Sequence, residues 1–125
     1  MSEPVILRGV VTTGVGGHAH WMVKYADLYR SATGLHLFPG SLNLRLSEPW
    51  HAPQRALRLE PPEYGVGMSL VPCEIGGINA FILRTDKNDA GEGDHPPTVV
   101  EVAAAVRLRD ALGLDDGDIA EVVVR

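Results

Sequence analysis

The sequence predicts a mostly β domain with one main helix, folded as a compact, mostly antiparallel barrel of six to seven strands. Short runs of aliphatic and β-branched residues recur along the chain without alternating regularly with helices, which argues against a parallel doubly wound sheet. Fourteen glycines and nine prolines among 125 residues supply turns between short elements. A chain of this length is expected to form one domain, residues 1–125, that buries a core without covalent cross-links.

The first half of the chain contains the predicted main helix. A strand is expected at 5–11, followed by a glycine-rich loop at 12–17. Apolar residues then recur every three or four positions over 21–32, which predicts a helix, and Gly34 stands where its C-cap is expected. Alternating residues at 41–46 predict a second strand. The proline-rich segment 47–62 is expected to be a connector with at most one short strand, at 56–59.

The second half is predicted to consist mainly of strands. Strands are expected at 68–75 and 78–84, joined across Gly76 and Gly77 as a hairpin. The acidic segment 86–97, rich in glycine and proline, is expected to be an exposed loop. A strand at 98–104, a helical turn at 107–112 and a final strand at 119–124 complete the predicted barrel.

The charge balance excludes several classes of partner. Acidic residues outnumber basic ones by 16 to 11, for a formal net charge of −5. Nucleic-acid binders usually carry a basic excess, so we expect no nucleic-acid partner. No apolar run approaches the roughly 20 residues of a membrane span, and the N-terminal residues lack the features of a secretory signal. We therefore expect a cytoplasmic protein without membrane contact, in which the one cysteine, Cys73, is a small core residue.

The glycine-rich loop is the first candidate site. Residues 14–19 fit the pattern G-x-G-x-x-A between a strand and a helix, where glycine amides can approach phosphate oxygens closely. A dinucleotide site would also need an acidic residue about 20 positions further on, and this chain has none at 35–39. Two interpretations remain open at this point: a loop that holds phosphates in another fold, and a plain tight turn.

Three further side-chain groups could carry chemistry. Ser41 and Asn43 share one face of the predicted strand, and their hard oxygens suit Mg²⁺, although a solvated strand face would look the same. Glu101 lies inside an apolar strand, either as an outward-facing spacer or as a base near a reacting hydroxyl. Arg107 and Arg109 could hold a polyphosphate or could be ordinary surface arginines.

Two apparent metal motifs are not supported by their spacing. His18 and His20 could ligate zinc, but no third ligand stands at a diagnostic distance. The segment 86–91 begins like a calcium loop but has Ala90 where an oxygen ligand is needed.

Taken in order, these motifs resemble the CTP-dependent riboflavin kinases, which are best known from archaea. The resemblance covers nearly the whole chain. In its first half it rests on Leu-Arg-Gly-Val-Val at 7–11 leading into the glycine loop, on the helical stretch 25–34, and on Phe-Pro-Gly-Ser-Leu-Asn-Leu-Arg-Leu at 38–46. In its second half it rests on Leu-Val-Pro-Cys-Glu-Ile at 70–75, on Val-Val-Glu-Val-Ala at 99–103, and on Val-Arg-Leu-Arg at 106–109 before Leu-Asp-Asp-Gly-Asp at 114–118.

The resemblance implies a cradle-loop β-barrel and an enzyme that transfers the γ-phosphate of CTP to the 5′-hydroxyl of riboflavin, giving FMN and CDP. Riboflavin and CTP would be its partners, and Mg²⁺ its cofactor, in a monomer or small homo-oligomer. By the same resemblance, Ser41 and Asn43 would hold the metal, Glu101 would be catalytic, and Glu101 and Thr98 would contact the flavin. The nucleotide would be bound by the loop and by the later arginine segment: Thr12, Thr13, Gly14, Val15, Gly16, Gly17, Val106, Arg107, Leu108 and Arg109.

A second interpretation from another class stays open. The family's glycine loop usually reads Gly-x-Gly-Glu-Gly, whereas this chain has Gly17 and His18 at the last two places. The family's Thr-His-Tyr stretch is replaced here by residues 93–96. These departures favour a non-catalytic flavin- or nucleotide-binding or regulatory barrel module. The kinase is favoured by the residues that are retained together: Ser41, Asn43, Glu101 and Arg109.

Overall fold

The computed structural model describes residues 4–14, 18–62, 66–93 and 95–125, and these form seven strands and four short helices. The strands are β1 (Val5–Thr12), β2 (Leu42–Leu46), β3 (Leu57–Leu59), β4 (Met68–Ile75), β5 (Ile78–Thr85), β6 (Val99–Ala104) and β7 (Ile119–Val124). The helices are α1 (His18–Lys24), α2 (Ala26–Thr33), α3 (Asp86–Asp89) and α4 (Leu108–Leu112). Among the described residues, no helix combines the length and the apolar content needed to cross a bilayer.

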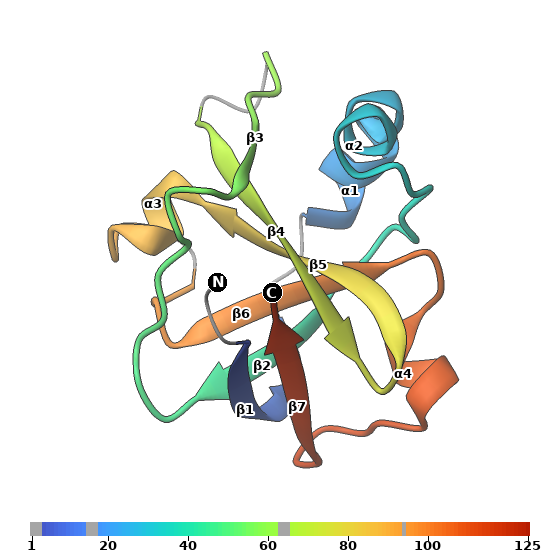
Figure 1. The fold of residues 1–125 in the computed structure, drawn as a ribbon, viewed down its shortest axis with the longest axis vertical. Coiled ribbons are helices and arrows are strands. Elements are labelled where there is room, and N and C mark those ends of the chain that lie inside the picture. The colour runs from blue at the N-terminus through green and yellow to red at the C-terminus, as the bar shows by residue number, and fades with distance from the viewer. Residues whose placement is uncertain (1–3, 15–17, 63–65, 94) are drawn as a thin grey trace.

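The strands form a closed antiparallel barrel. Neighbours follow the order β3-β4-β5-β6-β2-β1-β7, and β7 also pairs with β4, where Cys73 lies opposite Val124 and Ile75 opposite Val122. Six strands therefore close on themselves, while β3 is an extra strand added to β4 (Figure 1). This confirms the predicted fold class, a mostly β antiparallel barrel with few helices.

Alternation along the strands divides the apolar residues into two cores. The barrel interior is filled by side chains such as Leu44, Ile82 and Val102, each fully buried. A second core forms outside the barrel, where Tyr29 and Met22 of the helices pack against the outer face of β4 and β5. Because β4 and β5 are covered on both faces, their residues are buried almost continuously, and alternation is clearest in β1 and β7.

The predicted single helix over 21–32 is wrong, because the structure has two helices in this segment. Tyr25 adopts φ −109° and ψ 30°, which ends α1 and starts α2, although backbone hydrogen bonds from Tyr25 to Trp21 and from Tyr29 to Tyr25 continue across the joint. A dihedral change at one residue preserves the spacing of apolar side chains, so periodicity alone could not reveal it. The predicted cap is confirmed: Gly34 has φ 76°, and its N–H donates to the carbonyl of Arg30.

The predicted loop over 86–97 is also wrong in part, because it starts with a short helix. Thr85 is the N-cap of α3, and its hydroxyl oxygen accepts a hydrogen bond from the backbone N–H of Asn88. Threonine is a favourable N-cap, so the start of this helix was readable from the sequence. The hairpin prediction between β4 and β5 is confirmed, with positive φ angles at Gly76 and Gly77.

Candidate active site

A row of polar side chains crosses three neighbouring strands. Thr12 of β1 pairs with Asn43 of β2, and Asn43 pairs with Glu101 of β6. These residues alternate with the side chains that fill the barrel, so they lie on its outer face. The row continues through Leu83 of β5 to Leu70 of β4, which belong to the apolar core beneath the helices. Opposite residues in such pairs have Cβ atoms about 5 Å apart.

Glu101 is the centre of a buried polar group. Its side chain is 8% exposed, and its Oε1 accepts a hydrogen bond of 3.3 Å from the hydroxyl of Ser41, which directly precedes β2. On the other side, Nε2 of His95 lies 3.7 Å from the same oxygen. The hydroxyl and the carboxylate that were predicted to share the site are therefore in direct contact.

Asn43 has an unusual environment for a buried amide. The residue is 9% exposed, and its Oδ1 atom has no hydrogen-bond partner among the described residues. Gly14 lies directly against it, since a Cβ atom at position 14 would be 2.4 Å from Asn43 Nδ2. Leaving a buried acceptor unpaired costs about 1–3 kcal/mol. An uncompensated oxygen beside the Ser41 hydroxyl and the Glu101 carboxylate fits the ligand preference of Mg²⁺, which binds hard oxygens and keeps several waters.

The glycine loop is tied to the second predicted nucleotide segment. The Thr13 hydroxyl donates to Asp116 at 2.6 Å, and Arg109 donates to the same carboxylate at 2.5 Å and to the carbonyl of Thr12 at 3.3 Å. The hydrogen bond from Thr13, followed by those from Arg109, holds the pKa of the Asp116 carboxyl below its usual value. Arg109 and the start of the loop are thus neighbours, although 97 residues separate Arg109 from Thr12. The predicted loop residues Val15, Gly16 and Gly17 lie outside the described part of the chain.

A small hollow of about 180 Å³ lies between the Ser41 segment and the arginine segment. It is lined by Phe38 to Leu42 from one side and by Arg107, Leu108 and Arg109 from the other. Leu108 begins α4 and is buried, whereas Arg107 is exposed and forms an ion pair with Asp110 at 2.6 Å. Val106 is also exposed. The Ser41 segment and the arginine segment therefore form two walls of one hollow.

A family model covers nearly the whole chain. The model named CTP-dependent riboflavin kinase, described as "Domain of unknown function DUF120", matches residues 11–124. The chain belongs to this family. The resemblance inferred from the motifs is thereby confirmed.

Curated relatives of this riboflavin kinase family member support the assignment. The riboflavin kinase of Methanocella arvoryzae is 32% identical over 127 residues, which cover 95% of this chain and 56% of that protein. The riboflavin kinase of Pyrobaculum arsenaticum is 34% identical, over 94% of this chain and 60% of that protein. This chain therefore spans less than two thirds of the length of these relatives. The riboflavin kinase of Aeropyrum pernix is 34% identical, with 90% of both chains covered.

Not every residue carried over from the family joins the group around Glu101. Thr98 directly precedes β6, and its carbonyl accepts the N–H of Leu46 at 2.7 Å, so it lies at the far end of β2 from Ser41. His95, in contrast, contacts Glu101 but was not among the predicted site residues. The sequence held a signal for it, because His95 is the histidine that remains where the family has its Thr-His-Tyr stretch, but only the fold of the 86–97 segment shows that this histidine faces Glu101.

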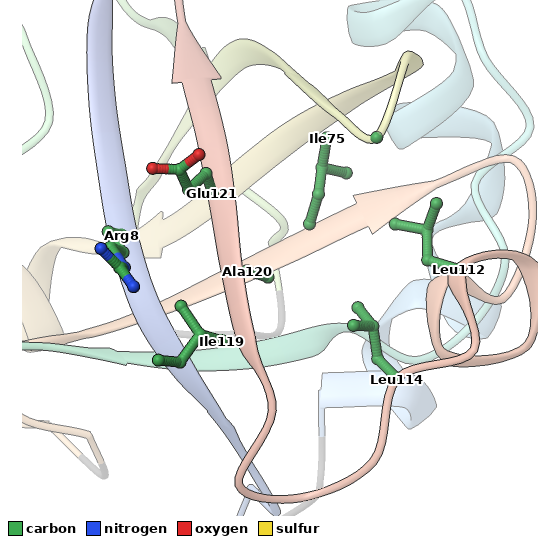
Figure 2. A pocket seen from close by; sticks show the side chains of 8 residues that line it. Arg8, Ile75, Leu112, Leu114, Ile119, Ala120 and Glu121 are labelled. Carbon is green, nitrogen blue, oxygen red and sulfur yellow. The ribbon is translucent and has the colours of Figure 1, made fainter.

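A larger hollow is lined by none of the polar side chains of this row. It has a volume of about 630 Å³ and is lined by Arg8, Glu121, Ile119 and neighbouring apolar residues, as Figure 2 shows. None of the predicted site residues lines it. Its size alone therefore does not identify it as the active site.

Proposed function

We propose that this chain phosphorylates riboflavin at its 5′-hydroxyl, with CTP as the phosphate donor and Mg²⁺ as the required metal. The observation that carries the proposal is the buried amide oxygen of Asn43, which has no hydrogen-bond partner in the described part of the chain and lies beside Ser41 and Glu101. A barrel without a ligand at this position would gain stability by placing an apolar residue there. Family membership supports the same activity, because the relatives described above are named riboflavin kinases.

The substrate matches the polarity of the row. Riboflavin joins an apolar ring system to a polar ribityl chain that ends in the reacting hydroxyl. The row changes in the same order, from Leu70 and Leu83 beneath the helices to Glu101, Asn43 and Thr12. We infer that the ribityl chain lies toward Glu101 and that the ring lies toward the apolar part of the row.

The nucleotide would occupy the other side of the polar group. Its phosphates would be bound by the 12–17 loop and by Arg109, whose guanidinium already lies at the carbonyl of Thr12. The rest of the nucleotide would extend along 106–109, one wall of the hollow opposite the Ser41 segment. In this arrangement the γ-phosphate would lie between the loop and Glu101.

Phosphoryl transfer depends mainly on alignment and on charge stabilisation. When bound, Mg²⁺ would neutralise charge on the phosphate oxygens, held by Ser41 and Asn43. Glu101 would orient the attacking hydroxyl and accept its proton as the new oxygen–phosphorus bond forms and the bond from the γ-phosphorus to the bridging oxygen breaks. CDP leaves with the electrons of that bond, so the products are FMN and CDP.

The direct test is synthesis of FMN. The protein is incubated with riboflavin, MgCl₂ and one nucleoside triphosphate at a time, and FMN is separated by chromatography. We expect FMN with CTP, much less with ATP, and none after chelation of divalent ions. Tight riboflavin binding without FMN from any nucleotide would instead support the non-catalytic module favoured by the altered loop at Gly17.

The proposed roles can be tested in the same assay. Asn43→Ala and Glu101→Gln should each reduce kcat by about a hundredfold or more, because one removes a metal ligand and the other removes the base. Full turnover by Glu101→Gln together with loss in Asn43→Ala would show that Glu101 is not the base while leaving the metal site intact.

A further inference from the structure

His95 is placed where it can control the orientation of Glu101. Its Nε2 lies 3.7 Å from Glu101 Oε1, and the two side chains are only 12% and 8% exposed. The Ser41 hydroxyl contacts the same oxygen at 3.3 Å from the β2 side. The carboxylate is thus bracketed by a hydroxyl and an imidazole. Catalytic hydrogen bonds are often long before substrate binds and tighten in the complex, which is consistent with the 3.7 Å separation.

Hydrogen bonds to buried side chains hold the backbone of the turn at His95 and after it. The backbone N–H of His95 donates to Oδ1 of Asn88 at 3.3 Å, and Asn88 is itself buried and bound to the N-cap Thr85. Beyond the histidine, the guanidinium of Arg84 donates to the carbonyls of Pro97 and Val99 at 3.2 and 3.1 Å. Two buried side chains, Asn88 and Arg84, therefore fix the backbone that carries the imidazole.

Arg84 shows how firmly this turn is held. Its side chain is 1% exposed, and desolvation lowers the pKa of its guanidinium despite the nearby Asp89. Besides the two carbonyls after His95, it donates to the carbonyl of Trp50 at 2.6 Å and to Asp89 at 3.1 Å. Burying a cation is costly unless hydrogen bonds satisfy it, and the bonds of Arg84 meet this condition. Here its bonds reach both Val99, at the start of β6, and the turn before it.

We propose that His95 is a positioning residue that holds the Glu101 carboxylate in the orientation needed to receive the proton of the attacking hydroxyl. The inference rests on the proposed kinase function and adds a residue to its machinery. Without the imidazole, the glutamate side chain gains rotamer freedom and spends less time in the reactive orientation. The expected consequence is a lower kcat with a nearly unchanged KM for riboflavin and for CTP.

The test compares His95→Asn with His95→Gln. Asparagine is too short to reach Glu101, whereas the glutamine amide can place an N–H near the position of Nε2. We expect kcat to fall by about tenfold or more in His95→Asn and to recover to within about threefold of the parent in His95→Gln. His36→Asn is the matched control: this exposed histidine lies between α2 and β2, outside the Arg84 network, and its replacement should leave kcat unchanged.

A double-mutant cycle separates positioning from a general effect on the fold. In a Glu101→Gln background the carboxylate is absent, so His95→Asn should cause no further loss of kcat. Equal fractional losses in both backgrounds, or full kcat in His95→Asn, would overturn the proposal while the parent still makes FMN. If His95→Asn does not fold, as judged by its thermal transition, His95→Leu replaces it in the same cycle. Absence of FMN from the parent protein would refute the kinase function itself.

Discussion

Replacing Asn43 by leucine should stabilise the protein while abolishing its activity. Leucine has a similarly branched side chain and needs no hydrogen bond, whereas the Asn43 oxygen is buried with no partner among the residues that the structure describes. Removing an unpaired buried acceptor of this kind should raise the free energy of unfolding by about 1–2 kcal/mol. For a domain of this size, that change corresponds to a rise in Tm of about 4–8 °C.

Asn88 provides the matched control. It is also a buried asparagine, 7% exposed, but its Oδ1 accepts the N–H of His95 at 3.3 Å. Asn88→Leu should therefore lower the free energy of unfolding by about 1–3 kcal/mol, because a backbone donor loses its partner. Differential scanning calorimetry of the two variants should give shifts of opposite sign.

The metal can be tested in the same calorimetric experiment. Mg²⁺ with CDP, each at about a hundred times its Kd, should stabilise the parent protein by roughly 2.7 kcal/mol per site. Asn43→Leu should lose most of this ligand-dependent shift. The reasoning is refuted if Asn43→Leu is destabilised as strongly as Asn88→Leu, because the amide oxygen would then have a structural partner in solution. It is refuted equally if the variant keeps the full response to Mg²⁺.

Three further predictions address the loop, its acidic partner and the cysteine. Gly14→Ala should reduce kcat by about a hundredfold, because its Cβ atom would overlap the Asn43 amide, whereas Gly34→Ala should cost about 1 kcal/mol of stability through its positive φ and leave kcat unchanged. Asp116→Asn should raise the KM for CTP by about threefold to tenfold in steady-state assays. Because the folded-state pKa of Asp116 lies below 3.8, its contacts should persist from neutral pH to about pH 4 and weaken only as the pH falls further. Burial raises the pKa of Cys73 to about 12, so the native thiol should resist a thiol reagent at pH 8 and react after unfolding.

The barrel itself was predictable because its signals are local. Alternation, glycine pairs and the lack of regular helices identified the strands, and the bounds of β4 and β7 agree with the prediction. The break at Tyr25 was not predictable from apolar spacing, because one changed dihedral leaves that spacing intact. The short helix α3 was missed although its N-cap, Thr85, follows a known rule.

The candidate site was predictable as residue types but not as a geometry. Ser41, Asn43 and Glu101 were each identified with an ordinary alternative beside them, since a polar residue on a strand is usually a solvated one. What distinguishes the two cases is the register that sets Asn43 between Thr12 and Glu101. Register between strands that are 58 residues apart depends on barrel closure, and no local pattern encodes it.

The buried polar residues of the barrel can be separated by whether the fold itself satisfies them. Ser69 accepts from Arg58, Thr85 accepts from Asn88, and Arg84 and Asn88 hold the turn around His95. Each of these side chains therefore contributes to the structure in which it is buried. The Asn43 oxygen is buried at the same depth and, among the described residues, contributes no such bond. A ligand that compensates the desolvation of this atom is the explanation on which the proposed function rests, and under that proposal Ser41 and Glu101 would serve the transfer of phosphate to an alcohol.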